Sequence, residues 1–205
     1  MNSQSKYPDF DVMREAPEWD DHTREIVKKR LEPIDSFTYL KAGEILILRA
    51  IASTLIDDER DEILAFILQH FDSHLQSKIG EDQRKAGTPP EAELIRRGLG
   101  AIDETAQGRS GGTFSKLPLK ERQTLLGQVE REELPASGQW VGLPQKELFK
   151  KLLQLTVEAY YSHPTVWSEI GYAGPAYPRG YVRSELGLAD PWEPQLGSSS
   201  VSQKE

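Results

Sequence analysis

The sequence predicts an all-α protein of about six helices in a compact bundle, followed by an irregular, aromatic, Gly/Pro-rich C-terminal segment. Three observations support this prediction. Apolar residues recur at helical spacing in several long stretches. Prolines stand at the starts of these stretches or just after their ends, where a helix tolerates them. No stretch shows the sustained two-residue alternation, bounded by turns, that is typical of strands.

Each helix is expected from a local pattern. The first begins with acidic residues and ends with three basic residues, which suits the helix dipole. The fourth and fifth begin with proline, whose missing N–H does no harm there. The sixth carries an apolar stripe of Leu148, Leu152, Leu155 and Ala159. The six predicted ranges are residues 20–31, 41–56, 58–76, 90–107, 118–132 and 144–162.

The two ends of the chain lack such patterns. Residues 1–19 contain prolines and aromatic residues without a usable period, so we expect an extended N-terminal arm. Residues 20–163 are then the helical domain. Residues 164–196 are expected to be an irregular aromatic docking segment. Residues 197–205 are rich in serine and are expected to be a disordered tail.

Aromatic residues are concentrated near the C-terminus. Residues 160–192 contain five tyrosines and two tryptophans of the 17 aromatic residues in the chain, together with four glycines and four prolines. Such a segment must bury its rings, either against its own helices or on another protein, and both alternatives stay open. Gly171, Gly174 and Gly180 are expected to permit the backbone turns that present the rings.

Composition excludes several classes of function. The 33 acidic residues against 25 Lys and Arg give a net charge of −8, which argues against nucleic acid binding. The absence of cysteine excludes disulfides, thiolate-bound zinc and a cysteine nucleophile. The longest aliphatic run is Ile45–Leu48, far short of the roughly 20 residues that span a membrane. Residues 1–20 show no export signal and no twin-arginine pair, so we expect a cytoplasmic chain, or one exported with a signal-bearing partner.

The histidines are the only candidates for a metal or acid–base site. His70 and His74 are four positions apart and would lie on one face of a helix. The glutamate that follows the first histidine in a zinc-protease motif is absent, so we expect two surface histidines rather than metal ligands. His163 follows a helix end, where a capping role is expected rather than that of a general base. The glycines match no nucleotide-binding motif. We therefore expect no catalytic, cofactor or metal site in this chain.

The stretch from Tyr160 to Tyr181 resembles the C-terminal signature of the gluconate 2-dehydrogenase subunit 3 family. That signature has the form Tyr-Tyr-Ser-x-Pro, then Trp, then Ile-Gly-Tyr-x-Gly-Pro-Ala-Tyr-Pro-Arg-Gly-Tyr, and the match is close throughout. Weaker similarity extends the resemblance to about residues 35–192. One departure is Ile56-Asp57, where Ile-Pro is usual in the family.

This resemblance implies a non-catalytic small subunit. Its partner would be a large, FAD-containing subunit of the glucose-methanol-choline type that oxidises a sugar or polyol, in a 1:1 complex that a haem c subunit sometimes joins. The small subunit would bind, stabilise and help to mature that partner. It would hold no cofactor of its own.

Aromatic residues and arginine are enriched in interface cores, so the C-terminal segment supplies the candidate partner-binding residues. Two other functions stay open: a scaffold or adaptor for something other than a flavoprotein, and a free-standing sugar-active enzyme that uses His163. The candidate partner-binding residues are Trp167, Tyr172, Pro175, Tyr177, Pro178, Arg179, Gly180, Tyr181 and Trp192.

Overall fold

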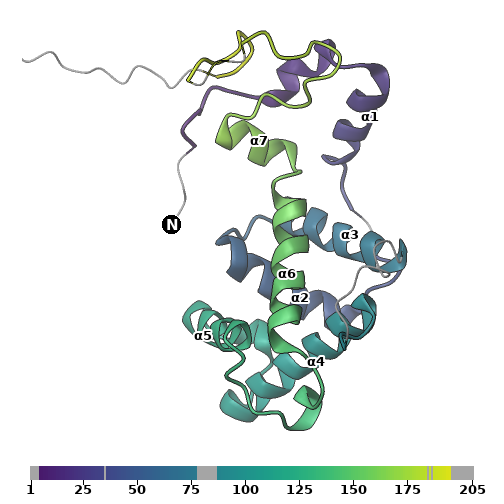
Figure 1. Ribbon diagram of the computed structural model, residues 1–205, viewed down its shortest axis with the longest axis vertical. Helices are drawn as coiled ribbons and strands as arrows, with labels where there is room; N and C mark the ends of the chain where they lie inside the picture. The colour runs from purple at the N-terminus through teal and green to yellow at the C-terminus, as the bar shows by residue number, and fades with distance from the viewer. Residues whose placement is uncertain (1–4, 35, 78–86, 184, 186, 195–205) are drawn as a thin grey trace, which may run out of the picture. The chain divides into compact units, whose positions relative to one another are not determined.

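The computed structural model describes residues 5–34, 36–77, 87–183, 185 and 187–194 (Figure 1). Across these ranges the chain forms helices and no strand, so the all-α prediction is confirmed. The tail predicted for residues 197–205 lies outside the described residues. The α-helices are α1 (Asp21–Lys29), α2 (Ala42–Ile56), α3 (Asp61–Ser77), α4 (Glu91–Ser110), α5 (Leu119–Glu130), α6 (Gln145–Tyr160) and α7 (Pro164–Ile170). The 3₁₀ helices are η1 (Val12–Glu18), η3 (Phe114–Lys116) and η4 (Gly138–Trp140).

The chain divides into two compact units. The helical unit comprises Pro33–Tyr160, and the terminal unit combines both ends of the chain, Met1–Glu32 and Tyr161–Glu205. The sequence predicted a boundary near residue 20 and another near residue 163 instead. Helix α1 falls in the terminal unit because Val27 packs into an apolar cluster with residues of η1 and α7.

Helix α6 forms the centre of the helical unit, and α2, α3, α4 and α5 all pack against it (Figure 1). The predicted stripe of Leu148, Leu152, Leu155 and Ala159 is buried along its whole length. Helix α2 contacts α3, α4 and α5 as well as α6, so it is buried on several sides rather than along one stripe. The four long helices that pack on α6 therefore share one core.

Two local devices fix this packing. Gly98 of α4 lies so close to α6 that an added Cβ would overlap the side chain of buried Leu148. The buried carboxylate of Asp72 on α3 accepts hydrogen bonds from the segment that precedes α2. Its four donors are the backbone N–H groups of Thr38, Tyr39 and Leu40 and the Thr38 hydroxyl, at 2.7–2.9 Å. Burial alone would raise the pKa of Asp72, but these hydrogen bonds outweigh it and lower the pKa.

The N-terminal arm is not extended throughout, which corrects the prediction. Residues 12–18 form η1, whose N-terminus is capped by Asp11 through the backbone N–H of Met13 at 3.0 Å. At the other end, Arg24 donates hydrogen bonds to the carbonyl groups of Ala16 and Trp19, at 3.0 and 2.8 Å. A side chain of the following helix thus supplies hydrogen-bond donors to the carbonyl groups at the end of η1. No periodic pattern in the sequence indicates this contact.

The segment after Pro164 is not wholly irregular either, which is a second correction. Pro164 does not merely follow α6, which ends at Tyr160, but occupies the first turn of α7. Proline is favoured at this position because its fixed φ suits a helix start and its missing N–H is not needed. The predicted docking segment therefore begins with a helix.

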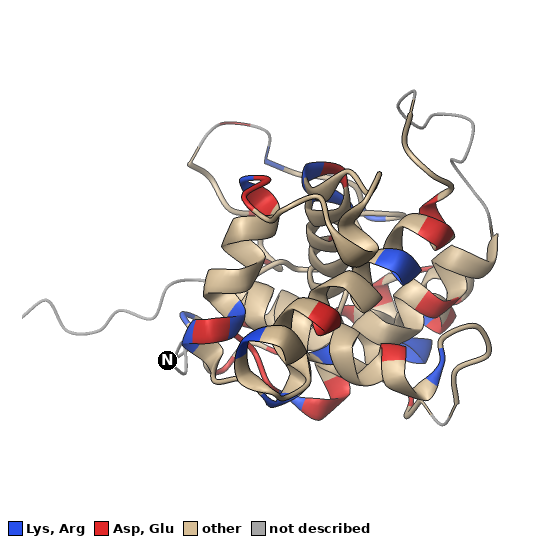
Figure 2. Ribbon diagram, turned by 90° about the horizontal axis from the view of Figure 1, so that it is seen from below, with Lys and Arg blue, Asp and Glu red and all other residues tan. Residues whose placement is uncertain are grey.

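Acidic residues outnumber basic ones, but the two signs are mixed along the helices (Figure 2). Figure 2 shows basic and acidic positions interspersed on the ribbon rather than gathered into one basic face. None of the helices in the described ranges is long and apolar enough to cross a bilayer.

Candidate functional site

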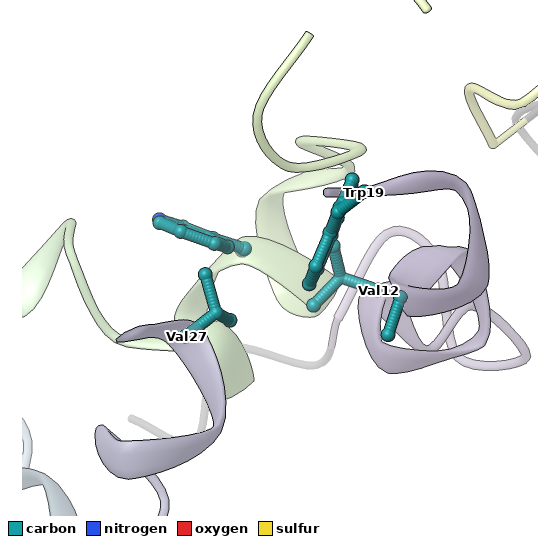
Figure 3. Packing of buried hydrophobic residues seen from close by; sticks show 5 residues of the cluster. Val12, Trp19 and Val27 are labelled. Carbon is teal, nitrogen blue, oxygen red and sulfur yellow. The ribbon is translucent and has the colours of Figure 1, made fainter. Parts of the chain in front are cut away.

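The aromatic segment folds together with the N-terminus in the terminal unit. Trp167 of α7 is buried in a cluster with Val12, Trp19 and Val27, all from the first 30 residues (Figure 3). Arg30 covers the Trp167 ring, with its Cζ 5.4 Å from the ring centroid, and donates to the carbonyl of Ser162 at 2.9 Å. Burial lowers the pKa of Arg30. Trp167 therefore belongs to the core of this unit.

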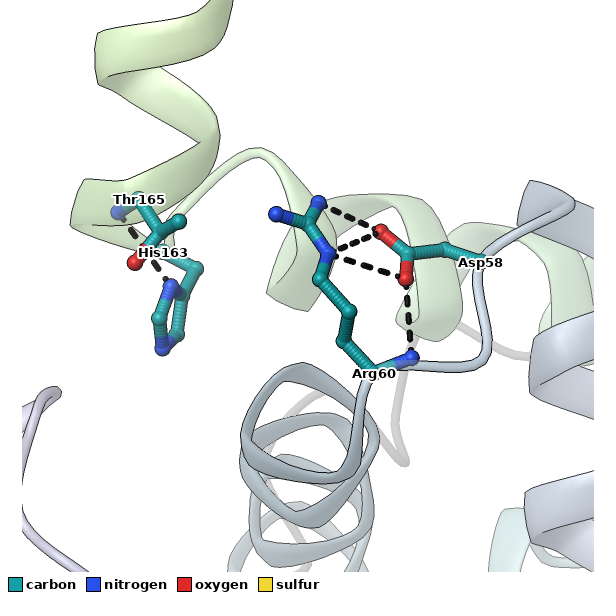
Figure 4. Close-up of polar contacts among 4 residues, drawn as sticks. All are labelled: Asp58, Arg60, His163 and Thr165. Atoms are coloured by element: carbon teal, nitrogen blue, oxygen red, sulfur yellow. Dashed lines mark hydrogen bonds and ion pairs between the residues drawn. The ribbon is translucent and has the colours of Figure 1, made fainter. Parts of the chain in front are cut away.

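Helix α7 is defined by its caps. His163, which is buried, accepts a hydrogen bond at Nδ1 from the backbone N–H of Thr165 at 3.3 Å (Figure 4). The prediction that His163 caps the end of the preceding helix is therefore wrong, because His163 caps the start of α7 instead. Gly171 ends the helix at a φ of 77°, and an added Cβ there would overlap the ring of Tyr7.

The loop that follows is held from inside by Arg179. Its Nη1 donates to Oε2 of Glu15 at 2.8 Å, and its Nη2 donates to the carbonyl of Ala173 at 2.7 Å. Its Cζ also lies 4.6 Å from the centroid of the Trp192 ring, in a cation–π contact. Only 9% of the Arg179 side chain is exposed, so it faces its own unit.

Asp190 forms a second internal anchor for the same loop. Its buried carboxylate accepts hydrogen bonds from the backbone N–H groups of Val182 and Arg183, at 3.1 and 2.7 Å. The backbone N–H of Asp190 in turn donates to the side chain of Glu193 at 2.7 Å. The Arg179 contacts thus hold the first part of the loop, at Ala173, and the Asp190 bonds hold its last part, at Val182 and Arg183.

Other large side chains of the same loop point outward. Tyr177 is 70% exposed, Tyr181 is 74% exposed and Val182 is 66% exposed. Tyr172 is partly exposed and packs edge-on against Trp167, with ring centroids 5.2 Å apart. Burial raises the pKa of the Tyr172 phenol, and the neighbouring Tyr181 raises it further. We call residues 172–183 the docking loop.

Seven of the nine candidate residues fall into two sets, and two lie between them. The inward set consists of Trp167, Arg179 and the half-buried Trp192. The outward set consists of Tyr172, Tyr177, Pro178 and Tyr181, while Pro175 and Gly180 are half-buried. The turns predicted at Gly171, Gly174 and Gly180 are confirmed, since all three have φ between 73° and 82°.

Sequence analysis missed Glu15 and Asp190, the two carboxylates that shape the docking loop. Glu15 is 164 positions from its partner Arg179, so no local pattern connects them. Asp190 bonds to residues seven and eight positions earlier, outside the spacings typical of helices or tight turns. An acidic residue within an aromatic, Gly/Pro-rich stretch was the one available signal.

No metal-binding group of three or more His, Asp or Glu side chains occurs among the described residues. His74 Nε2 lies 2.9 Å from Glu91 Oε1, and His70 Nε2 lies 3.8 Å from Glu158 Oε2. Acidic residues gather at the N-terminus of α3, where Asp61 and Glu62 lie in its first turn. Just before this helix, Asp58 pairs with Arg60 at 2.6 Å (Figure 4). Burial would raise the pKa of Asp58, but the Arg60 hydrogen bonds outweigh it and lower the pKa.

A hollow of about 430 Å³ opens on the terminal unit, with Tyr7, Phe10 and Met13 among its lining residues. The Ser168 hydroxyl beside it accepts from the backbone N–H of Val12 at 3.0 Å and donates to the carbonyl of Pro164 at 3.1 Å. This serine therefore uses its hydroxyl in two structural hydrogen bonds, one of which joins α7 to η1.

The described residues define an all-α protein that exposes three tyrosines, Tyr172, Tyr177 and Tyr181, on a loop held by buried charges. The family model described as gluconate 2-dehydrogenase subunit 3 matches residues 42–174, more than half of the chain. The chain therefore belongs to this family, which confirms the resemblance found in the sequence. By its description, the family consists of dehydrogenase subunits. Searches of curated proteins and of solved structures gave no match. The matched range ends at Gly174, before Tyr177 and Tyr181.

Proposed function

We propose that this chain is the non-catalytic small subunit of a sugar or polyol dehydrogenase. It binds, stabilises and helps to mature a large FAD-containing subunit of the glucose-methanol-choline type, in a 1:1 complex. The observation that carries this proposal is membership of a family of dehydrogenase subunits. The flavin belongs to the large subunit, and this chain contributes protein surface rather than chemistry.

The arrangement of side chains supports a role in binding rather than catalysis. The docking loop exposes Tyr177 and Tyr181, residues of a type enriched at protein interfaces. His163, the general base of the alternative enzyme, is buried and uses Nδ1 to cap α7. An acid–base catalyst must reach the proton that it moves, so a buried helix cap is a poor candidate.

Co-expression tests the proposal. A glucose-methanol-choline flavoprotein of the same host is produced with and without this chain, and the soluble yield, the FAD content and the dehydrogenase activity are measured. We expect co-purification at 1:1 and a several-fold higher yield of FAD-loaded large subunit. Because a ligand that binds only the folded state stabilises it, the large subunit should also melt at a higher temperature in the complex.

Two results would count against the proposal. If the two chains do not co-purify and the large subunit is equally soluble, loaded and active alone, the accessory role is wrong. If they co-purify but FAD content is the same with and without this chain, binding stands and the role in maturation falls.

A further inference from the structure

We propose that the docking loop is a preformed contact surface that inserts Tyr177, Tyr181 and Val182 into an apolar pocket on the flavoprotein subunit, with an acidic side chain at the pocket rim opposite Arg183. Arg179 and Asp190 hold the loop in shape and do not touch the partner. This inference rests on the proposed function and deepens it, because it names the surface and the kind of partner site that the surface fits.

The loop is ordered by contacts within its own unit. Arg179 joins Glu15, the Ala173 carbonyl and the Trp192 ring, and Asp190 fixes the backbone at Val182 and Arg183. A hydrogen bond of 2.6 Å from the Gly180 N–H to the Ala176 carbonyl closes the turn between the two exposed tyrosines. A loop already fixed in its bound shape loses little entropy on binding, which favours affinity.

The docking loop exposes large side chains close together in sequence, and grouped exposure is more informative than single exposed residues. Tyr177, Tyr181 and Val182 each expose about two thirds or more of their surface, within six residues of chain. A tyrosine buries about 150–250 Å² when covered and has few rotatable bonds to freeze, so two of them can anchor an interface.

Charge identifies the occupant. Residues 170–183 contain two arginines and no acidic residue, in a chain of net charge −8. Arg179 is neutralised by Glu15, whereas Arg183 is exposed and makes one long bond of 3.4 Å to the Ala189 carbonyl. The buried Asp190 carboxylate lies beneath Arg183, at its backbone N–H. The surface therefore offers one exposed cation beside apolar rings, and it fits a partner pocket with a carboxylate at its rim.

The same charge disfavours a membrane as the occupant. A single cation is a weak attraction to an anionic membrane, which is recognised by clusters of basic residues. A folded, acidic-rimmed protein pocket remains the best fit.

The test measures affinity between the full-length chain and the purified large flavoprotein subunit, identified by mass and by its FAD absorbance. Tyr177→Ala/Tyr181→Ala should weaken binding by about thirtyfold or more, as expected when interface anchors are removed. Val182→Ser should weaken it several-fold. Val141→Ser is the matched control, since Val141 is 60% exposed but lies in the helical unit, and it should bind as the wild type does.

A charge series tests the rim. Arg183→Glu should weaken binding at least tenfold and reduce its dependence on salt, while Arg183→Lys should retain most of the affinity. Tryptophan fluorescence checks folding of each variant, because Trp19, Trp167 and Trp192 all lie in the terminal unit. A variant that loses affinity with an unchanged unfolding curve supports direct contact.

The outcomes separate this inference from the proposed function. If the wild-type chain binds the flavoprotein and both tyrosine substitutions leave the affinity unchanged, the docking loop is overturned while the accessory role stands. If the wild-type chain does not bind the flavoprotein, both fall. Concentration-dependent dimerisation abolished by Tyr177→Ala/Tyr181→Ala, or binding to phosphatidylserine vesicles abolished by Arg183→Glu, would overturn the inference in favour of the occupant concerned.

Discussion

At Arg179 one side chain meets a carboxylate, a carbonyl oxygen and an aromatic face, and each contact uses a different property of the guanidinium group. The charge pairs with Glu15, a second nitrogen donates to Ala173, and the planar face lies over Trp192. A lysine could keep the charge but not the fork and the plane together. Arg179 therefore organises a segment that has no regular secondary structure of its own.

This arrangement predicts that Arg179→Ala destabilises the terminal unit. The substitution leaves Glu15 without its partner and removes two charged hydrogen bonds, so we expect a loss of about 1.5–3 kcal/mol in the free energy of unfolding. Arg183→Ala is the control on the same loop, and because Arg183 is exposed it should change stability by less than about 0.5 kcal/mol. Denaturant unfolding followed by tryptophan fluorescence measures both. Equal stability of the two variants would mean that Arg179 does not hold the loop.

At the scale of helices and loops, the long helices were predictable because their burial follows a period. The stripe on α6 was identified from spacing alone, and all four of its residues are buried. Helices η1 and α7 were missed because they are short and are stabilised by distant residues, such as Ser168 of α7, whose hydroxyl accepts from the backbone N–H of Val12 in η1, 156 positions away. Short helices depend on such contacts more than on propensity.

The candidate site was predictable to a similar degree. The aromatic residues that form it were identified, because their composition alone sets the segment apart. Which rings face inward was not predictable, since Trp167 is covered by Trp19 and Val27, about 140 positions away. Long-range packing of this kind leaves no trace in local spacing.

Two glycines of α4 give a matched prediction for the helical unit. Gly98→Ala places a Cβ against the buried side chain of Leu148, where there is no room to move, and should cost about 1–3 kcal/mol. Gly108→Ala on the same helix meets nothing within 4 Å and should stabilise by up to about 1 kcal/mol, because alanine favours helix. Thermal unfolding followed by far-ultraviolet circular dichroism measures both changes. A stabilising Gly98→Ala would show that α4 and α6 do not approach closely.

At the scale of the whole molecule, both ends of the chain contribute to one unit. The N-terminal residues Val12 and Trp19 and the C-terminal residue Trp167 share one apolar cluster, so neither end can form it alone. The surface proposed for the partner thus depends on residues from both ends. The helical unit supplies the larger core and carries none of the exposed residues of the docking loop.

This division predicts that stability changes in the two units add. Gly98 contacts Leu148 in the helical unit, whereas Arg179 contacts Glu15, Ala173 and Trp192 in the terminal unit, so the two substitutions share no partner. Sites without shared partners usually add to within about 0.5 kcal/mol. The double variant Gly98→Ala/Arg179→Ala should therefore change the free energy of unfolding by the sum of the two single changes. A deviation from that sum well beyond about 0.5 kcal/mol would contradict the division, because the terminal unit would then depend on the packing of α4 against α6.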